Sequence, residues 1–293
     1  MNKFLLSTDT SCDEMKSDMR SRGISYVPLT FTIDGVTYDD DFDSNEQYSN
    51  FYAQLRDKKL PTTSQITPAM HSEYFNSLIE QGATDIIHLT LSSGLSNTYN
   101  SAVMGAAETM ETHPGVKIHV LDSFSATQGQ AMLLDEAAMI RDSGESAEEA
   151  MKALKKTAFS IHHWFYADDL FHLCRGGRVS KVSAVIGSIL KIKPVLIIND
   201  EGKLAVVHKA KGVRGALKYF TEQYEKYAAD TKGEVYLPSA DSNDVAEMFK
   251  QELESTYGCK VKIGWVGPVI GAHTGGGMLG FVFRSKNGRL SDK

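Results

Sequence analysis

Short apolar runs alternate with helix-like segments over the first half of the chain. Four runs have the length and composition of buried strands, and four segments place their apolar residues at helical spacing. This alternation predicts βαβ units and a parallel sheet that helices cover on both faces. The predicted strands span 3–9, 24–33, 84–91 and 116–123, and the predicted helices span 45–60, 68–82, 96–112 and 125–144.

After a predicted connecting helix over 146–160, strand-like segments dominate and fewer helices separate them. They span 162–168, 193–200, 203–211, 233–240, 259–273 and 278–285. The four residues 199–202, NDEG, have the composition of a hairpin turn. We therefore expect an α/β chain of two domains, with a parallel sheet in residues 1–157 and an α+β arrangement in residues 158–293.

Charge and composition narrow the classes of function. The chain has 293 residues, a formal net charge of −6 and three cysteines, which have no metal-ligand spacing. An acidic surface repels nucleic acid, so we expect no nucleic-acid partner, and the isolated cysteines fit a cytoplasmic location. No apolar stretch has the length of a membrane span. The acidic run 39–46 lacks the glycine and glutamate positions of an EF-hand, so we expect no bound metal.

Polar segments follow the predicted strands at the edge where parallel sheets bind ligands. In one of them, SSGLSNTYNSA (92–102), a catalytic serine turn would need a second glycine that the sequence lacks. Ser96 instead suits a helix N-cap, which leaves Ser93 beside a helix N-terminus that favours an anion. We expect a binding role here. The alternative is a serine hydrolase that uses Ser93 or Ser96 with Asp122 and His273.

The segment GAHTGGGMLG (271–280) contains the spacing GxGxxG. A strand-like run follows it, however, where a dinucleotide site needs a helix and then an acidic residue, so we expect no nucleotide cofactor. His273 in the same segment is a candidate ligand-binding residue. The earlier segment PTTSQITP (61–68) offers several hydroxyl groups, with Thr67 as N-cap and Pro68 as the first residue of a helix.

Residues 172–196 combine a double glycine with basic side chains. Arg175, Arg178 and Lys181 crowd the start of a predicted helix, which Ser180 caps and whose apolar face comprises residues 182, 185, 186, 189 and 190. Cations oppose the helix dipole at that end, so the pattern favours a site for an anion or a partner.

Taken together, these motifs resemble the DegV family of bacterial fatty-acid-binding proteins. The matching segments follow in order along nearly the whole chain: STDTS, YVPLTFTIDGVTYDD, PTTSQITP, LTLSSGLSNTYNSA, LDS, DDLFHLCRGGRVS, LKIKPVL with its hairpin, and GAHTGGG. The resemblance implies two α/β domains that hold one long-chain fatty acid, with its carboxylate at the domain junction, and a non-catalytic role. It also implies a partner, the catalytic subunit of fatty acid kinase, which phosphorylates the bound carboxylate to an acyl phosphate that feeds phospholipid synthesis.

By motif, the resemblance assigns the fatty-acid carboxylate to Thr63, Ser93 and His273. Arg175 and Arg178 resemble basic residues that face the partner kinase or make transient contact with the membrane surface. Around these motifs, we expect further residues to support the pocket: Ser64, Gly94, Ser96 and Thr274.

Overall fold

The structure is a computed structural model that describes residues 4–168, 170–179 and 192–291. The helix predicted from the apolar face at 182–190 lies outside the described residues, as do its cap Ser180 and the neighbouring Lys181. The described residues form three sheets and the helices that cover them.

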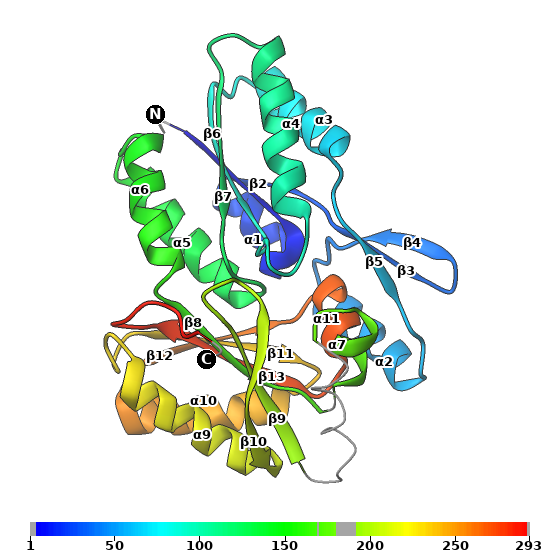
Figure 1. Ribbon diagram of the computed structural model, residues 1–293, viewed down its shortest axis with the longest axis vertical. Coiled ribbons are helices and arrows are strands. Elements are labelled where there is room, and N and C mark those ends of the chain that lie inside the picture. The colour runs from blue at the N-terminus through cyan, green and yellow to red at the C-terminus, as the bar shows by residue number, and fades with distance from the viewer. Residues whose placement is uncertain (1–3, 169, 180–191, 292–293) are drawn as a thin grey trace.

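The first sheet is parallel throughout, in the order β2-β1-β6-β7, as the strand–helix alternation predicts. Helices α3 and α4 pack together on one face, and α5 and α6 on the other (Figure 1). The elements are β1 (Leu5–Asp9), a 3-10 turn η1 (Thr10–Cys12), α1 (Lys16–Ser21), β2 (Ile24–Val27), α3 (Pro68–Glu80), β6 (Asp85–Thr90), α4 (Thr98–Thr112), β7 (Lys117–Asp122), α5 (Gln128–Asp142) and α6 (Ala147–Ala158).

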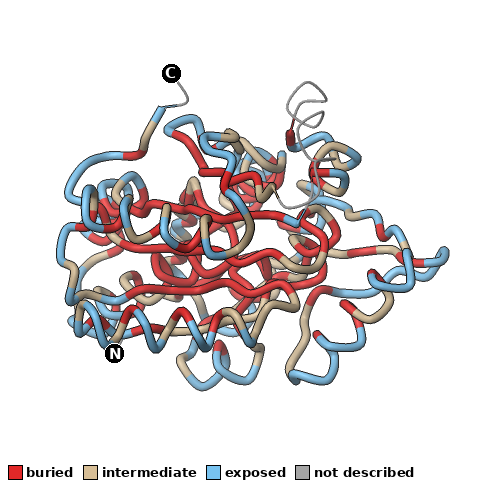
Figure 2. The backbone as a smooth tube through the Cα atoms, turned by 90° about the horizontal axis from the view of Figure 1, so that it is seen from below, coloured by how far each residue is buried: buried red, intermediate tan, exposed pale blue. Residues whose placement is uncertain are grey.

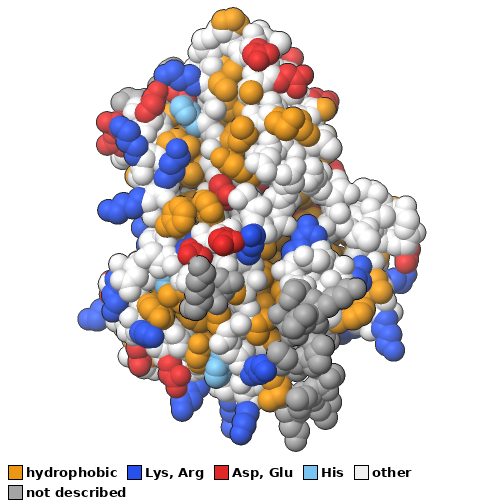
Figure 3. Space-filling model, in the orientation of Figure 1, with side chains coloured by type: hydrophobic (Ala, Val, Ile, Leu, Met, Phe, Trp, Pro, Cys, Tyr) orange, Lys and Arg blue, Asp and Glu red, His pale blue; other side chains and the backbone are white. Residues whose placement is uncertain are grey.

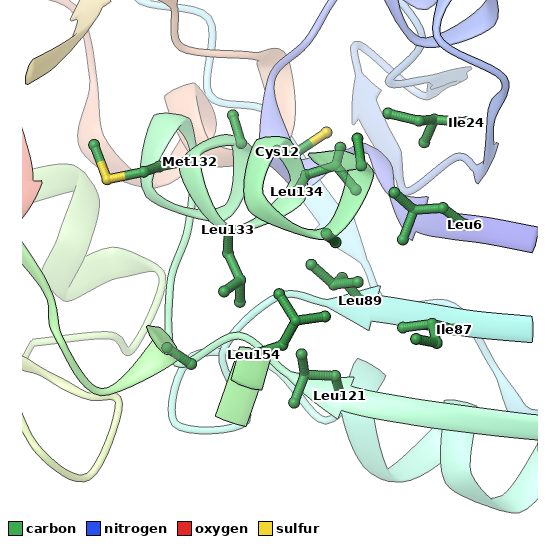
Figure 4. Packing of buried hydrophobic residues seen from close by; sticks show 14 of the residues in the cluster. Leu6, Cys12, Ile24, Ile87, Leu89, Leu121, Met132, Leu133, Leu134 and Leu154 are labelled. Carbon is green, nitrogen blue, oxygen red and sulfur yellow. The ribbon is translucent and has the colours of Figure 1, made fainter. Parts of the chain in front are cut away.

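Alternate residues of β6 belong to two different cores. Leu89 shares a cluster with Leu133 of α5 and Leu154 of α6 (Figure 4). Ile86 belongs instead to the cluster under α3 and α4. Successive strand side chains point to opposite faces, so a strand that is buried on both faces has a continuous apolar sequence. The run DIIHLTL has this character.

The second sheet is mixed, in the order β10-β9-β8-β13-β11-β12, and only β11 and β12 pair in parallel. Helices α9 and α10 cover one face with a core of their own. Figure 2 shows the central strands buried and the surrounding helices partly exposed. The elements are β8 (Ile161–Tyr166), α7 (Phe171–Arg175), β9 (Ile192–Ile198), β10 (Leu204–Lys211), α9 (Gly212–Tyr227), β11 (Glu234–Ala240), α10 (Asn243–Tyr257), β12 (Lys260–Trp265), α11 (Pro268–Thr274) and β13 (Met278–Arg284).

A small antiparallel sheet in the order β4-β3-β5 corrects one strand prediction. The single strand predicted over 24–33 is two strands in different sheets, β2 and β3 (Thr30–Ile33). Pro28 lies between them, and proline has no N–H for a sheet ladder and a fixed φ, so the chain turns there. The remaining elements of this region are β4 (Val36–Asp39), α2 (Asn45–Arg56) and β5 (Thr62–Ser64).

The strand predicted over 259–273 is also wrong in its second half. Strand β12 ends at Trp265, and α11 begins at Pro268. Proline is favoured at the first position of a helix because that position needs no N–H donor. His273 therefore lies in the last turn of a helix.

The predicted cap at Thr67 and the predicted hairpin are confirmed, whereas the cap predicted at Ser96 is wrong. The Met70 N–H donates to Thr67 Oγ1, which caps α3, and the hairpin closes between Asn199 and Lys203. Helix α4 starts later than predicted, at Thr98; Ser96 does not cap it from the N-cap position, but its Oγ accepts the Thr98 N–H.

One core combines residues from both halves of the sequence. Val27, Phe31 and Phe51 pack in the same cluster as Phe165 and Met278. The small sheet and α2 thus pack against elements that follow residue 160, and α11 contacts β3, β5 and α2. The domain boundary at residue 157 remains a prediction. Figure 3 shows acidic and basic side chains mixed over one face of the molecule, with hydrophobic side chains over α4.

Candidate functional site

A cavity of about 330 Å³ lies between the second sheet and the segments that face it. Strands β8, β11 and β13 line one side, and β5, α7, α11 and the loop after β6 line the others. Strand β13 leads away from α11, so Val282 lies about 14 Å along the strand from Met278. Most of the lining is apolar: Leu29, Leu91, Leu95, Ala126, Phe165, Leu173, Ile198, Leu204, Pro238, Val269, Ile270, Met278 and Val282.

Two of the predicted carboxylate-binding residues meet in this cavity. Thr63 of β5 and His273 of α11 both line it, and Thr63 Oγ1 lies 2.9 Å from His273 Nε2. Strand β5 holds Thr63 through its pairing with Phe31 of β3. A hydroxyl and an imidazole N–H at this separation can both donate to one carboxylate group. Of the residues expected to support the pocket, three also line it: Ser64, Ser96 and Thr274.

The imidazole of His273 is neutral at neutral pH. Burial lowers its pKa to about 4, and the positive charges of Arg178 and Arg175 act in the same direction. A neutral ring that carries its proton on Nε2 can donate a hydrogen bond to Thr63 or to a ligand oxygen. The other ring nitrogen, Nδ1, has no hydrogen-bond partner among the described residues.

This histidine explains the first glycine of the pair after α7, and the φ of +73° at Gly177 explains the second. A Cβ on Gly176 would lie 2.1 Å from His273 Nδ1, so only glycine allows α7 to approach the ring this closely. Arg175 donates from Nη2 to the carbonyls of Pro61 and Ala272, at 2.8 and 3.3 Å. These bonds tie α7 to the segment before β5 and to α11.

Arg178 lines the same cavity while remaining exposed to solvent. Its Nε donates to the carbonyl of Leu95 at 3.0 Å, which links the end of the RGGR motif to the loop after β6. The contact that Arg175 and Arg178 are predicted to make with a partner or a membrane remains a prediction.

The loop after β6 packs against the hairpin between β9 and β10. Ser92 Oγ donates to the Gly202 carbonyl at 2.7 Å, and a Cβ on Gly94 would lie 2.5 Å from that carbonyl group. Gly94 does not line the cavity but holds this wall in place, because any side chain there would push the hairpin away.

The structure does not bring Ser93 to Thr63 and His273. Ser93 is exposed, its side chain is not part of the cavity lining, and its N–H donates to the Asp122 carboxylate at 3.2 and 3.3 Å. Ser96, from the same loop, is the serine that lines the cavity. Its hydroxyl lies 2.9 Å from that of Thr98.

The side chains of the alternative hydrolase are not arranged as a triad. The His273 ring bonds to Thr63, whereas the Asp122 carboxylate accepts the N–H groups of Ser93 and Phe124. A serine nucleophile needs its base within hydrogen-bond reach and a third group to orient that base. The described geometry offers no such relay between Ser96, His273 and Asp122.

Among the polar residues of the lining that the sequence analysis did not assign to the site are Thr127 and His163. Thr127 has φ 53° and ψ −139°, a conformation that a β-branched residue rarely adopts. No sequence signal marks it. His163 lies two residues before Phe165 on β8, and the two-residue period of a strand places both side chains on the same face.

Over the described ranges, no three His, Cys, Asp or Glu side chains converge to hold a metal ion. Within those ranges, no helix has the length and apolar character needed to cross a membrane.

Comparison with known proteins identifies the family. The model of the DegV family, described as an uncharacterised protein family, matches residues 3–286. A DegV domain-containing protein of Clostridium perfringens is 35% identical over 285 residues, which cover 97% of this chain and 98% of that protein.

Solved structures of similar fold match this chain over nearly its whole length. One is a DegV family protein of Thermus thermophilus that is described as binding fatty acid. It matches this chain with a TM-score of 0.85 and 27% identity, over 97% of this chain and all of that chain. The fatty acid kinase B3 protein of Streptococcus pneumoniae, loaded with linoleic acid, shares the fold with a TM-score of 0.82 at 21% identity, over 95% of this chain and 98% of that chain. The motifs that carry the resemblance, the fold and the full-length match agree: this chain belongs to the DegV family.

Proposed function

We propose that this protein binds one long-chain fatty acid without changing it chemically and presents the carboxylate to a fatty acid kinase. The observation that carries the proposal is a cavity of apolar walls in which a hydroxyl and a neutral imidazole, those of Thr63 and His273, lie 2.9 Å apart. The walls suit an acyl chain, and the polar pair suits its carboxylate. The fatty acid binding described for the Thermus thermophilus relative supports the same ligand class.

The acyl chain supplies most of the binding free energy in this proposal. A tail of about 15 methylenes, at about 0.8 kcal/mol for each buried methylene, gives about 12 kcal/mol before the costs of ordering and association. A carboxylate in an apolar cavity would oppose binding unless it were hydrogen-bonded. Thr63 and His273 meet this need without a charged clamp, which would hold the oxygens more tightly and hinder their attack on a phosphate.

The proposed kinase partner rests on the resemblance and on the position of the RGGR motif. Arg175 and Arg178 lie beside the cavity and reach solvent, where a docking protein could contact them. The fold is shared with a fatty acid kinase B protein.

A phosphoryl-transfer assay tests this proposal. Delipidated protein is loaded with palmitate and incubated with a bacterial fatty acid kinase catalytic subunit and ATP, and acyl phosphate is trapped with hydroxylamine. We expect an ATP-dependent hydroxamate from the palmitate-loaded protein and none from protein loaded with hexadecanol. Palmitate binding without any hydroxamate would contradict the kinase partner, and absence of palmitate binding would contradict the whole proposal.

For a third carboxylate contact, we propose the serine loop. Ser93 is the residue that the family motif indicates, and Ser96 is the one that lines the cavity. Comparing Ser93→Ala with Ser96→Ala in a palmitate-binding assay distinguishes them, because only the variant that loses the contacting hydroxyl binds palmitate more weakly. If both variants bind like the unmodified protein, the loop does not contact the carboxylate.

A further inference from the structure

A second cavity, of about 300 Å³, lies between the start of α1, α2, α10 and β12. Among the described residues it shares no lining residue with the apolar cavity. Its lining is acidic, with four carboxylates and a single lysine: Asp13, Glu14, Asp18, Glu247 and Lys262.

The acids beside this cavity differ in whether they have partners. Glu14 accepts from Lys262 Nζ at 2.7 Å, and the buried Asp40 accepts the Val269 N–H at 3.1 Å. Asp13 is 6% exposed, and neither of its carboxylate oxygens has a partner of hydrogen-bonding geometry among the described residues, although the Gly267 N–H is close by. Burying an unpaired carboxylate is costly, so a group that donates to both oxygens would stabilise this arrangement.

A second acceptor in the lining also lacks a donor. Gln128, at the start of α5, is 1% exposed and its Oε1 has no partner in the part of the chain that the structure describes. Its Nε2 donates to the Asp13 carbonyl at 3.4 Å, which leaves the amide oxygen on the other side of the group. The unmet demand of this cavity is therefore for hydrogen-bond donors.

Two glycines make room for these acceptors. A Cβ on Gly264 would lie 2.3 Å from the Gln128 amide, and one on Gly267 would lie 2.5 Å from Asp13 Oδ1. At either position, any residue larger than glycine would displace one of the two acceptor side chains. The backbone of this region therefore leaves space for the buried carboxylate of Asp13 and the buried amide of Gln128.

An aromatic pair forms another part of the lining. The rings of Tyr48 and Trp265 stack at 5.5 Å with an interplanar angle of 4°. Trp265 is held by a hydrogen bond of 2.8 Å from its Nε1 to Asn45 Oδ1. Aromatic faces attract cations, and a planar guanidinium stacks on them better than a compact ammonium.

We propose that this second cavity binds a small organic cation with a guanidinium group, which donates to both oxygens of Asp13 and to Gln128 Oε1. A guanidinium presents parallel N–H donors that match the two oxygens of one carboxylate. A bare metal ion is a poorer match, because no three suitable side chains converge within the described ranges. At the rim, Asp18 and Glu247 suit a second positive centre on the same molecule.

Binding of a cation would also change the protonation of Asp13. Burial, and then the nearby carboxylate of Asp40, raise the pKa of Asp13 well above its usual range. A bound cation offsets both effects and favours the ionised form of Asp13.

Agmatine provides the test, because it carries a guanidinium at one end and an ammonium at the other. N-carbamoylputrescine is the matched control, since a neutral urea replaces its guanidinium. By isothermal titration calorimetry on the full chain, with its apolar cavity filled with palmitate, we expect agmatine to bind at least about tenfold more tightly than the urea compound. Agmatine that does not bind, or that binds no better than the urea compound, would overturn the proposal.

Two single substitutions test whether agmatine binds in this second cavity. Asp13→Asn keeps the shape of the side chain and removes its charge, so we expect it to fold and to lose most of its agmatine affinity. Asp244→Asn makes the same charge change on an exposed residue of α10 outside the lining, and we expect it to bind agmatine as the unmodified protein does. Equal affinity of Asp13→Asn and Asp244→Asn would overturn the assignment to this cavity. Should Asp13→Asn not fold, Gln128→Met replaces it under the same criterion.

Discussion

Replacing Thr63 with valine removes one hydroxyl from the proposed carboxylate site and changes little else, because the two side chains have nearly the same shape. Thr63 Oγ1 lies 2.9 Å from His273 Nε2, and the two groups line one cavity. A hydrogen bond to a charged group contributes about 1.5–3 kcal/mol. Since 1.4 kcal/mol is a tenfold change, we expect Thr63→Val to weaken fatty-acid binding roughly 10- to 100-fold.

The assay compares two ligands and two variants. Palmitate and its methyl ester compete with a fluorescent fatty acid for the delipidated protein. We expect Thr63→Val to reduce the affinity for palmitate and to change that for the uncharged ester much less. Thr62→Val, an exposed residue of the same strand outside the lining, serves as the control and binds both ligands normally. Equal losses for acid and ester would refute the claim that Thr63 contacts the carboxylate, because they would indicate a change in the cavity walls.

Two further predictions concern Gly176, which packs against the site, and His71, a buried histidine of α3. Gly176→Ala would place a Cβ 2.1 Å from His273 Nδ1, so we expect thermal unfolding to show a destabilisation of about 1–3 kcal/mol. Gly288→Ala is the control and should leave stability unchanged, because there is open space around Gly288. Equal effects of the two substitutions would contradict the packing argument. Burial lowers the pKa of His71 to about 4, below its unfolded value near 6.5. The neutral His71 therefore contributes to the stability of the fold above pH 6.5, and this contribution is lost as the pH falls toward 4. From pH 7 to pH 5 in urea denaturation, the unmodified protein should lose about 2 kcal/mol more than His71→Gln. Because both proteins contain the same buried acids, such as Asp40 with its pKa raised to about 8, the comparison cancels their effect on stability, which has the opposite sign. If the free energy of unfolding changed equally with pH in both proteins, His71 would not be held neutral.

The parallel sheet and helices α2 to α6 could be predicted because each carries a local signal, whereas α1, α7 and the helices of the second half, α9 to α11, were not assigned. The strand β6 is a short apolar run, and α6 begins with a capping box at Ser146 and Glu149. The prediction failed where a proline changes the role of an apolar segment. Pro28 divides one apparent strand between two sheets, and Pro268 starts a helix within another apparent strand. Apolar content alone does not distinguish a strand from a short buried helix.

The candidate site could be predicted only in part, because it depends on which distant segments meet. Thr63 and His273 are 210 positions apart, and the sequence contains no sign of their contact other than the resemblance to the family. The serine loop shows the same limit. The sequence pattern favours Ser93 as the ligand-binding serine, because Ser96 suits a helix cap. In the structure the Ser93 N–H donates to Asp122 and Ser93 is exposed, whereas Ser96 lines the cavity. His163 and Thr127 belong to no distinctive motif, because His163 adjoins a second histidine in a buried strand and Thr127 lies in the polar segment SATQGQ.

The central claim is that the apolar cavity holds a fatty acid, and native mass spectrometry of the protein purified from a bacterial host tests it most directly. Denaturation and lipid extraction of the same sample then identify whatever has been bound. We predict one additional mass per chain under native conditions, which disappears on denaturation and matches a fatty acid of about 14 to 20 carbons. A protein that carries no such mass, and that takes up no palmitate when palmitate is added, would contradict the account.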